Sequence, residues 1–112
     1  MPGQSQRVRL TCIAVAMAAC ALLATSAQAY DPRADRGHRF ALTYCSQCHA
    51  IGKTGESPLK IAPPFRTLHE RYDVGDLSEA FAEGIVTGHP SMPEFRLEGD
   101  QIDDLLAYLK SL

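Results

Sequence analysis

The chain has 112 residues and a formal net charge of −2, with 11 basic against 13 acidic residues. This length limits it to one small domain, and this charge excludes a nucleic-acid-binding protein that relies on a dense cationic surface. Its four cysteines would indicate a disulfide scaffold only if all of them belonged to one folded unit.

Residues 1–29 have the features of a secretory signal peptide. Two arginines and no acidic residue precede an almost wholly apolar run from Leu10 to Ala24, and an Ala-Gln-Ala sequence ends at Ala29. The run has about 15 residues, which is shorter than the roughly 20 that a bilayer-spanning helix needs. We therefore expect cleavage after Ala29 and no stable membrane insertion afterwards. Lipidation of Cys20 is the alternative.

Cleavage after Ala29 would leave 83 residues, 30–112, as a single domain. The leader removes two arginines and no acid, so the net charge becomes −4, and only Cys45 and Cys48 remain of the cysteines. A domain of this size without disulfides has a small core and often depends on a cofactor or metal for its stability. The sequence should therefore contain residues that bind one.

The hydrophobic pattern of residues 30–112 predicts an all-α fold without β-strands. The first helix is expected from Pro32 to Cys48, and residues 49–63 form a loop rich in Gly, Ser and Pro. Pro63-Pro64 then begins a short helix. The predicted inward-facing residues are Gly37, Phe40, Ala41, Tyr44 and Cys48 in the first helix, and Phe65, Leu68 and Tyr72 in the second.

Two more helices are predicted in the C-terminal half. A capping-box-like sequence at Asp76 begins a helix that extends to about Thr87. Residues 88–97 are irregular because two prolines interrupt them, and Asp100 caps a last helix. The predicted inward-facing residues are Leu77, Phe81 and Ile85, then Ile102, Leu105, Leu106, Leu109 and Leu112.

The sequence Cys45-Ser46-Gln47-Cys48-His49 is the most specific motif in the chain. Cysteines three residues apart on a helix lie about one turn apart on the same face. There, two thiols can form thioether bonds to the two vinyl groups of one haem, and the following histidine can coordinate the iron. C-x-x-C-H is the attachment signature of a c-type haem, so we expect one covalently attached haem c with its iron.

Other uses of the motif fit the chain less well. A thioredoxin-like pair begins a helix in a strand–helix–strand unit, whereas this motif ends a helix and no strand is predicted. A structural zinc ion needs four ligands, and residues 30–112 contain no second cysteine pair. A disulfide would close a very small loop and leave His49 unexplained.

Met92 is the candidate for the sixth iron ligand. It lies between two prolines that restrict the backbone, rather than on the apolar face of a helix, where methionine fills a core. A thioether is a soft, neutral ligand that stabilises Fe(II) and raises the redox potential. His89 is the alternative ligand, and would give a bis-histidine haem. We expect His38 and His69, on helices, to be surface residues.

These residues give the chain a resemblance to small bacterial class I cytochromes c over nearly all of residues 30–112. The shared features are the helix that ends in C-x-x-C-H, the Met92 loop and the C-terminal helix with Tyr108. The resemblance implies about four helices wrapped around one haem. It also implies that the first and last helices cross at Gly37, with aromatic side chains such as Phe40 around the crossing.

The resemblance further implies that a proline after the haem loop supports the axial histidine, and both Pro63 and Pro64 qualify. The apolar pocket around the haem would include Leu68, Phe81, Ile85 and Phe95. An apolar surrounding of the iron is itself one of the factors that set the redox potential.

With His49 and Met92 in both axial positions, the iron has no open site for a substrate. We therefore expect a periplasmic, monomeric single-electron carrier, without enzymatic activity or a small-molecule substrate. It would meet redox proteins of a respiratory or dehydrogenase chain in transient encounters. The alternatives are a peroxidatic or gas-binding haem protein with an open sixth position, and a haem subunit of a larger dehydrogenase or oxidase.

Charged residues are distributed unevenly along the chain. The acidic cluster comprises Glu94, Glu98, Asp100, Asp103 and Asp104, and the basic cluster comprises Arg33, Arg36 and Arg39. Either these clusters serve only solubility, or they form a docking dipole that tunes the rate of partner encounter.

Overall fold

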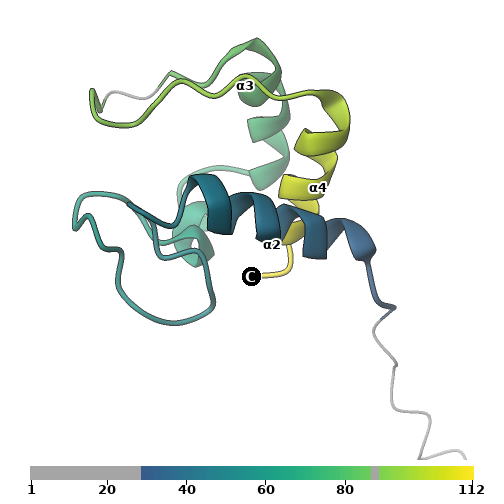
Figure 1. The fold of residues 1–112 in the computed structure, drawn as a ribbon, viewed down its shortest axis with the longest axis horizontal. Helices are drawn as coiled ribbons and strands as arrows, with labels where there is room; N and C mark the ends of the chain where they lie inside the picture. The colour runs from purple at the N-terminus through teal and green to yellow at the C-terminus, as the bar shows by residue number, and fades with distance from the viewer. Residues whose placement is uncertain (1–28, 87–88) are drawn as a thin grey trace, which may run out of the picture. The chain divides into compact units, whose positions relative to one another are not determined.

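Two helices from distant parts of the chain, α2 (Pro32–Tyr44) and α4 (Gly99–Leu109), cross and form the most extensive contact between elements (Figure 1). This computed structural model describes residues 29–86 and 89–112. Residues 1–28, and with them nearly all of the predicted signal peptide and Cys20, lie outside the described residues.

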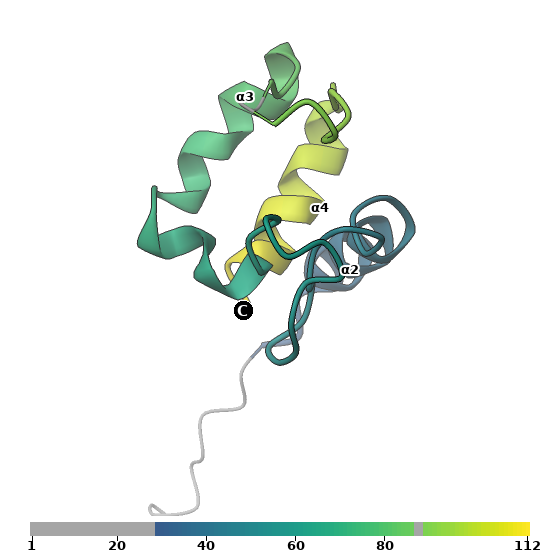
Figure 2. The same ribbon diagram turned by 90° about the vertical axis from the view of Figure 1, so that its left-hand side faces the viewer.

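Residues Asp31–Leu112 form one structural unit. Between α2 and α4 the chain forms two 3₁₀ helices, η1 (Phe65–Glu70) and η2 (Val74–Asp76), and the short helix α3 (Leu77–Glu83). Figure 2 shows α4 between α2 and α3. No strand occurs in the described ranges, where a single bridge between Ile85 and Phe95 is the only β-type pairing. The predicted all-α class is confirmed.

Helix α2 begins as predicted but ends earlier. Asp31 caps it by accepting a hydrogen bond from the Arg33 N–H at 2.9 Å, and Pro32 occupies the first turn. The predicted end at Cys48 is wrong. The N–H groups of Cys45 and Ser46 both donate to the Ala41 carbonyl, at 2.9 and 3.1 Å, and this widened turn stops the α-helical pattern.

The predicted crossing at Gly37 is confirmed. Gly37 is buried, and a Cβ atom there would overlap the backbone carbonyl of Asp104 and lie 2.8 Å from the Tyr108 Cβ. The ring that meets Tyr108 is His38, with centroids 5.0 Å apart. Phe40 packs against the core, and its ring meets Tyr44 at 4.7 Å. The missing side chain of Gly37 therefore lets the two helix backbones approach closely.

The second predicted helix is a 3₁₀ helix that begins after Pro64. Leu68 is buried in it and Phe65 is half-buried, as expected. Tyr72 lies beyond its end at Glu70, so the predicted placement of Tyr72 on this helix is wrong; its side chain is 44% exposed and lines the cavity among the helices.

Helix α3 begins after Asp76, as predicted, but it lacks the predicted side-chain cap and ends earlier. Asp76 provides no side-chain cap; instead the Asp73 carboxylate accepts from the Gly75 N–H at 2.7 Å, one turn earlier. The helix ends at Glu83 rather than near Thr87, because Gly84 adopts a φ of +106°, a left-handed conformation that glycine accepts readily.

Helix α4 begins at Gly99 with Glu98, rather than Asp100, in the N-cap position. The Gln101 side-chain oxygen accepts a hydrogen bond from the Glu98 N–H at 3.0 Å, as in a capping box. The Asp100 carboxylate instead accepts from the neighbouring Gln101 N–H at 2.9 Å.

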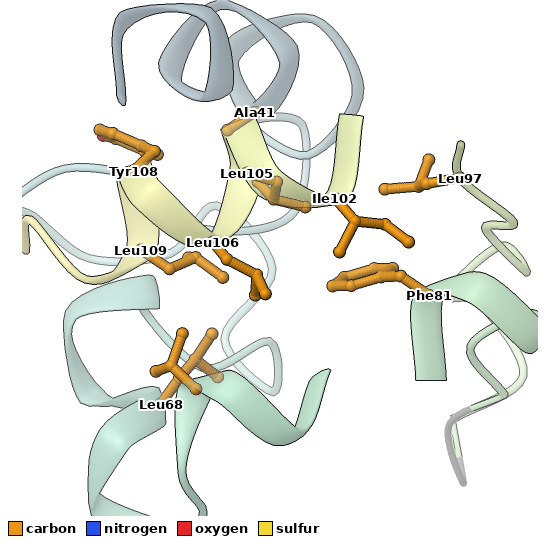
Figure 3. Close-up of a cluster of buried hydrophobic side chains, with 10 residues drawn as sticks. Ala41, Leu68, Phe81, Leu97, Ile102, Leu105, Leu106, Tyr108 and Leu109 are labelled. Carbon is orange, nitrogen blue, oxygen red and sulfur yellow. The ribbon is translucent and has the colours of Figure 1, made fainter. Parts of the chain in front are cut away.

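The core lies between α4 and the elements around it. Figure 3 shows α4 side chains directed toward Leu68 and Phe81. The buried residues of this cluster are Ala41, Leu68, Val74, Phe81, Leu97, Ile102, Leu105, Leu106, Tyr108 and Leu109. Leu112, Leu77 and Ile85 are half-buried against the cluster, whereas Tyr44 is 57% exposed. No helix in residues 29–86 or 89–112 is both long and apolar enough to cross a membrane.

The two charge clusters are partly neutralised by pairing. The Arg36 guanidinium donates two hydrogen bonds, each of 2.7 Å, to the Asp104 carboxylate across the α2–α4 crossing. Arg33 pairs with Asp31 at 3.0 Å. Because Arg36 and Asp104 join the basic and acidic clusters, these groups do not form a simple dipole of separated charges.

The Tyr108 hydroxyl connects α4 to the loop after α2, since it donates to the Ile51 carbonyl at 2.7 Å. We expect Tyr108→Phe to lower the free energy of unfolding at pH 7 by about 1 kcal/mol, the usual net contribution of such a bond. Burial raises the pKa of Tyr108. The stabilisation is therefore complete below pH 10, the ordinary tyrosine value, and is lost as the pH rises through the folded-state pKa.

Chemical denaturation of both haem-bound proteins at pH 7 and across pH 9–11 measures this difference. The stability of the unaltered protein should fall more steeply above pH 10 than that of Tyr108→Phe. A gap between the two proteins that stays constant with pH would contradict the prediction.

Candidate functional site

A cavity of about 390 Å³ lies among the helices of this unit. Side chains from α2, η1, α3 and α4 and from the connecting loops line it, and most of them are apolar or aromatic. All four predicted pocket residues, Leu68, Phe81, Ile85 and Phe95, are among them. The same cavity is lined by each predicted site residue: Cys45, Cys48, His49 and Met92.

The haem-attachment motif forms one compact turn at the end of α2. The N–H groups of Cys48 and His49 both donate to the Cys45 carbonyl, at 3.2 and 3.0 Å. The turn places both cysteines on the cavity, where they are free thiols. Burial raises the pKa of the Cys45 thiol to about 11, so it is protonated at neutral pH. Two thiols and an imidazole beside an apolar cavity are the donors that a covalently attached haem requires.

The orientation of His49 is fixed by the loop that follows it. Its Nδ1 lies 2.8 Å from the Pro63 carbonyl oxygen. Because a carbonyl can only accept, Nδ1 carries the proton and Nε2 has the lone pair that a metal would bind. The Phe65 ring lies 5.1 Å away, centroid to centroid. Pro63, rather than Pro64, is therefore the proline that supports this histidine.

Three hydrogen bonds connect the segment around His49 to the loop that carries Pro63. The Ala50 N–H donates to the Ser57 hydroxyl oxygen at 3.0 Å, and the Phe65 N–H donates to the Ala50 carbonyl at 2.9 Å. Leu59 N–H donates to the carbonyl of Cys48 at 3.1 Å. Sequence reasoning did not single out Ser57, because serine in a loop carries no signal for this role.

Met92 is carried by a loop whose base is anchored to α3. The Ile85 N–H donates to the Phe95 carbonyl at 2.9 Å, and the Arg96 guanidinium donates to the Glu83 carbonyl at 2.6 Å. Met92 is half-buried and lines the cavity. His89, the alternative ligand, is exposed but lines the same cavity, whereas His38 and His69 are exposed and do not line it.

Arg71 was not anticipated as a site residue. It is the one arginine or lysine among the described residues that line the cavity. A guanidinium pairs strongly with carboxylates, and haem carries two of them on its propionate groups. Only knowledge of the cavity lining could have identified Arg71, because its distinguishing feature is a cationic side chain among apolar ones.

Within the part of the chain that the structure describes, no three side chains of His, Cys, Asp or Glu gather into a metal-binding group. The profile of the family described as Cytochrome c matches residues 34–112. The chain is 29% identical over 92 residues to Cytochrome c-552 of Bradyrhizobium diazoefficiens, a match that covers 82% of this chain and 86% of that protein. No solved structure matches the chain significantly.

Proposed function

The chain belongs to the cytochrome c family and is a haem-based electron carrier with covalently attached haem c, and on that basis we propose that His49 and Met92 coordinate its iron. Cys45 and Cys48 would form the two thioether bonds. The observation that supports this assignment is that all four side chains, from two separate segments, line one apolar cavity.

Bound haem iron supplies the one-electron couple Fe(III)/Fe(II). The residues around the iron would set the redox potential of this couple. His49, held by Pro63, presents Nε2 in a fixed orientation, and the Met92 thioether favours the reduced state. The apolar wall excludes water, which disfavours the more highly charged oxidised state. Arg71 would pair with a haem carboxylate.

Electrons would pass to and from redox proteins in transient encounters at the cavity edge. Three large side chains that line the cavity are also exposed: Tyr44 to 57%, Ile61 to 61% and Tyr72 to 44%. Such a small apolar patch suits the weak, short-lived contacts of redox partners. The predicted signal peptide of residues 1–29 supports a periplasmic carrier, since the covalent haem bonds of this class are made outside the cytoplasm. We propose that this carrier is a monomer.

The test is the visible absorption spectrum of the oxidised protein, produced in a host with haem-attachment machinery. We expect the weak long-wavelength band that a methionine sulfur on ferric haem produces, and its loss in Met92→Ala. Met92 is the only methionine in residues 30–112, so the band has one possible source. The midpoint potential of the variant should fall by on the order of 100 mV, because axial ligands set haem potentials over roughly 0.8 V.

A high-spin spectrum of the unaltered oxidised protein would contradict the proposal. The iron would then have an open sixth position, and the peroxidatic or gas-binding function would take its place.

A further inference from the structure

Met92 shares a tight turn with His89. The Met92 N–H donates to the His89 carbonyl at 3.2 Å, so His89, Pro90, Ser91 and Met92 form a β-turn with His89 first and Met92 fourth. The Cα atoms of the first and fourth residues of a β-turn lie within about 7 Å of each other. Both side chains line the haem cavity. A nitrogen ligand and a sulfur ligand therefore lie at the two ends of one turn.

We propose that His89 is a reserve ligand for the sixth iron position, which binds there when Met92 leaves. This inference rests on the proposed function, in which Met92 is the resident ligand. It concerns a residue of the Met92 turn and does not involve the contact between His49 and Pro63.

Ser91 contacts the ring of His89. Its N–H donates to His89 Nδ1 at 3.4 Å, and its Oγ lies 2.7 Å from the same nitrogen. Because an N–H can only donate, Nδ1 accepts in this arrangement and the ring proton is on Nε2. For Nε2 to bind iron, the proton has to move to Nδ1, where the Ser91 hydroxyl oxygen can accept it.

The exchange needs no electron transfer. With haem bound, Met92 would release the iron and His89 would bind it through Nε2, with the ring proton on Nδ1. Both residues belong to a loop whose base is fixed by the Ile85–Phe95 bridge and by the Arg96 bond to the Glu83 carbonyl. The softer thioether favours Fe(II) and imidazole suits the harder Fe(III). His89 should therefore compete better in the oxidised protein.

The test uses the oxidised, haem-bound Met92→Ala variant and its electron paramagnetic resonance spectrum. We expect a low-spin signal typical of bis-histidine ligation, and its replacement by a high-spin signal in Met92→Ala/His89→Ala. The matched control, Met92→Ala/His69→Ala, should remain low-spin, because His69 is exposed and does not line the cavity. Adding imidazole should return the His89 double variant to low spin, which shows that its haem pocket is intact.

Three results would overturn the inference. They are a high-spin Met92→Ala protein that imidazole converts to low spin, a low-spin signal that survives removal of His89, and loss of the low-spin signal in the His69 control. Failure of the proposed function looks different, because the unaltered protein would then lack the methionine band.

A further variant, Met92→Ala/Ser91→Ala, should show a smaller low-spin fraction than Met92→Ala alone.

Discussion

We expect Gly37→Ala to lower the free energy of unfolding by about 2–3 kcal/mol, and Gly37→Val to prevent stable folding. In an ordinary helix interior the change from glycine to alanine stabilises by up to about 1 kcal/mol. Here the new Cβ would overlap the Asp104 carbonyl and lie 2.8 Å from the Tyr108 Cβ. Because a backbone carbonyl within α4 cannot rotate away, the two helices must separate, and the core beside them loses its packing.

Thermal unfolding of the haem-bound proteins measures this effect. A loss of about 2 kcal/mol should lower Tm by roughly 8–16 °C in a domain of this size. Gly99→Ala is the matched control, since a Cβ at the first residue of α4 would meet nothing within 4 Å. Equal Tm values for Gly37→Ala and the unaltered protein would show that the crossing tolerates a side chain.

The second large effect is expected on withholding the haem. Without haem, the apolar and aromatic side chains that line the cavity of about 390 Å³ would face water instead of the porphyrin. An 83-residue domain has a total stability of only about 4–12 kcal/mol. The haem-free chain should therefore be largely unfolded.

Residues 30–112, produced in the cytoplasm and kept reduced, provide this haem-free chain. Its far-ultraviolet circular dichroism should show little helix, and heating should give no cooperative transition. Native-like helix content with a cooperative melt would contradict the prediction, because it would mean that the helices can close over the cavity by themselves.

The interior of the fold was more predictable than the ends of its helices. The helical spacing of Ile102, Leu105 and Leu109 identified the buried face of α4, because burial selects apolar residues at that period. Helix ends depend instead on single hydrogen bonds among several similar candidates. Asp76 occupies the predicted N-cap position of α3 without a side-chain hydrogen bond, and Glu98 occupies the N-cap position of α4 that the sequence favoured for Asp100. The early end of α3 follows from the conformation of Gly84.

Site residues were predictable where the chemistry requires a fixed sequence spacing. They were not predictable where their role depends on which groups the fold brings together. The C-x-x-C-H motif and the proline-flanked methionine identified four residues that the structure brings to one cavity. The choice of Pro63 over Pro64 depends on which carbonyl meets His49 Nδ1. Arg71 depends on the path of the chain after η1, which no local pattern reveals.

The contact between α2 and α4 has a consequence for the order of events during synthesis. The ribosome makes α2 first and α4 last among the described elements, so the growing chain cannot complete its main helix pair until translation of these residues is nearly finished. Contacts between distant segments also form slowly because closing the long loop between them costs entropy. Since the haem-free chain is expected to be largely unfolded, the cysteines directly after α2 should still be accessible after export, and the enzymes that attach haem would meet an open polypeptide rather than a closed pocket.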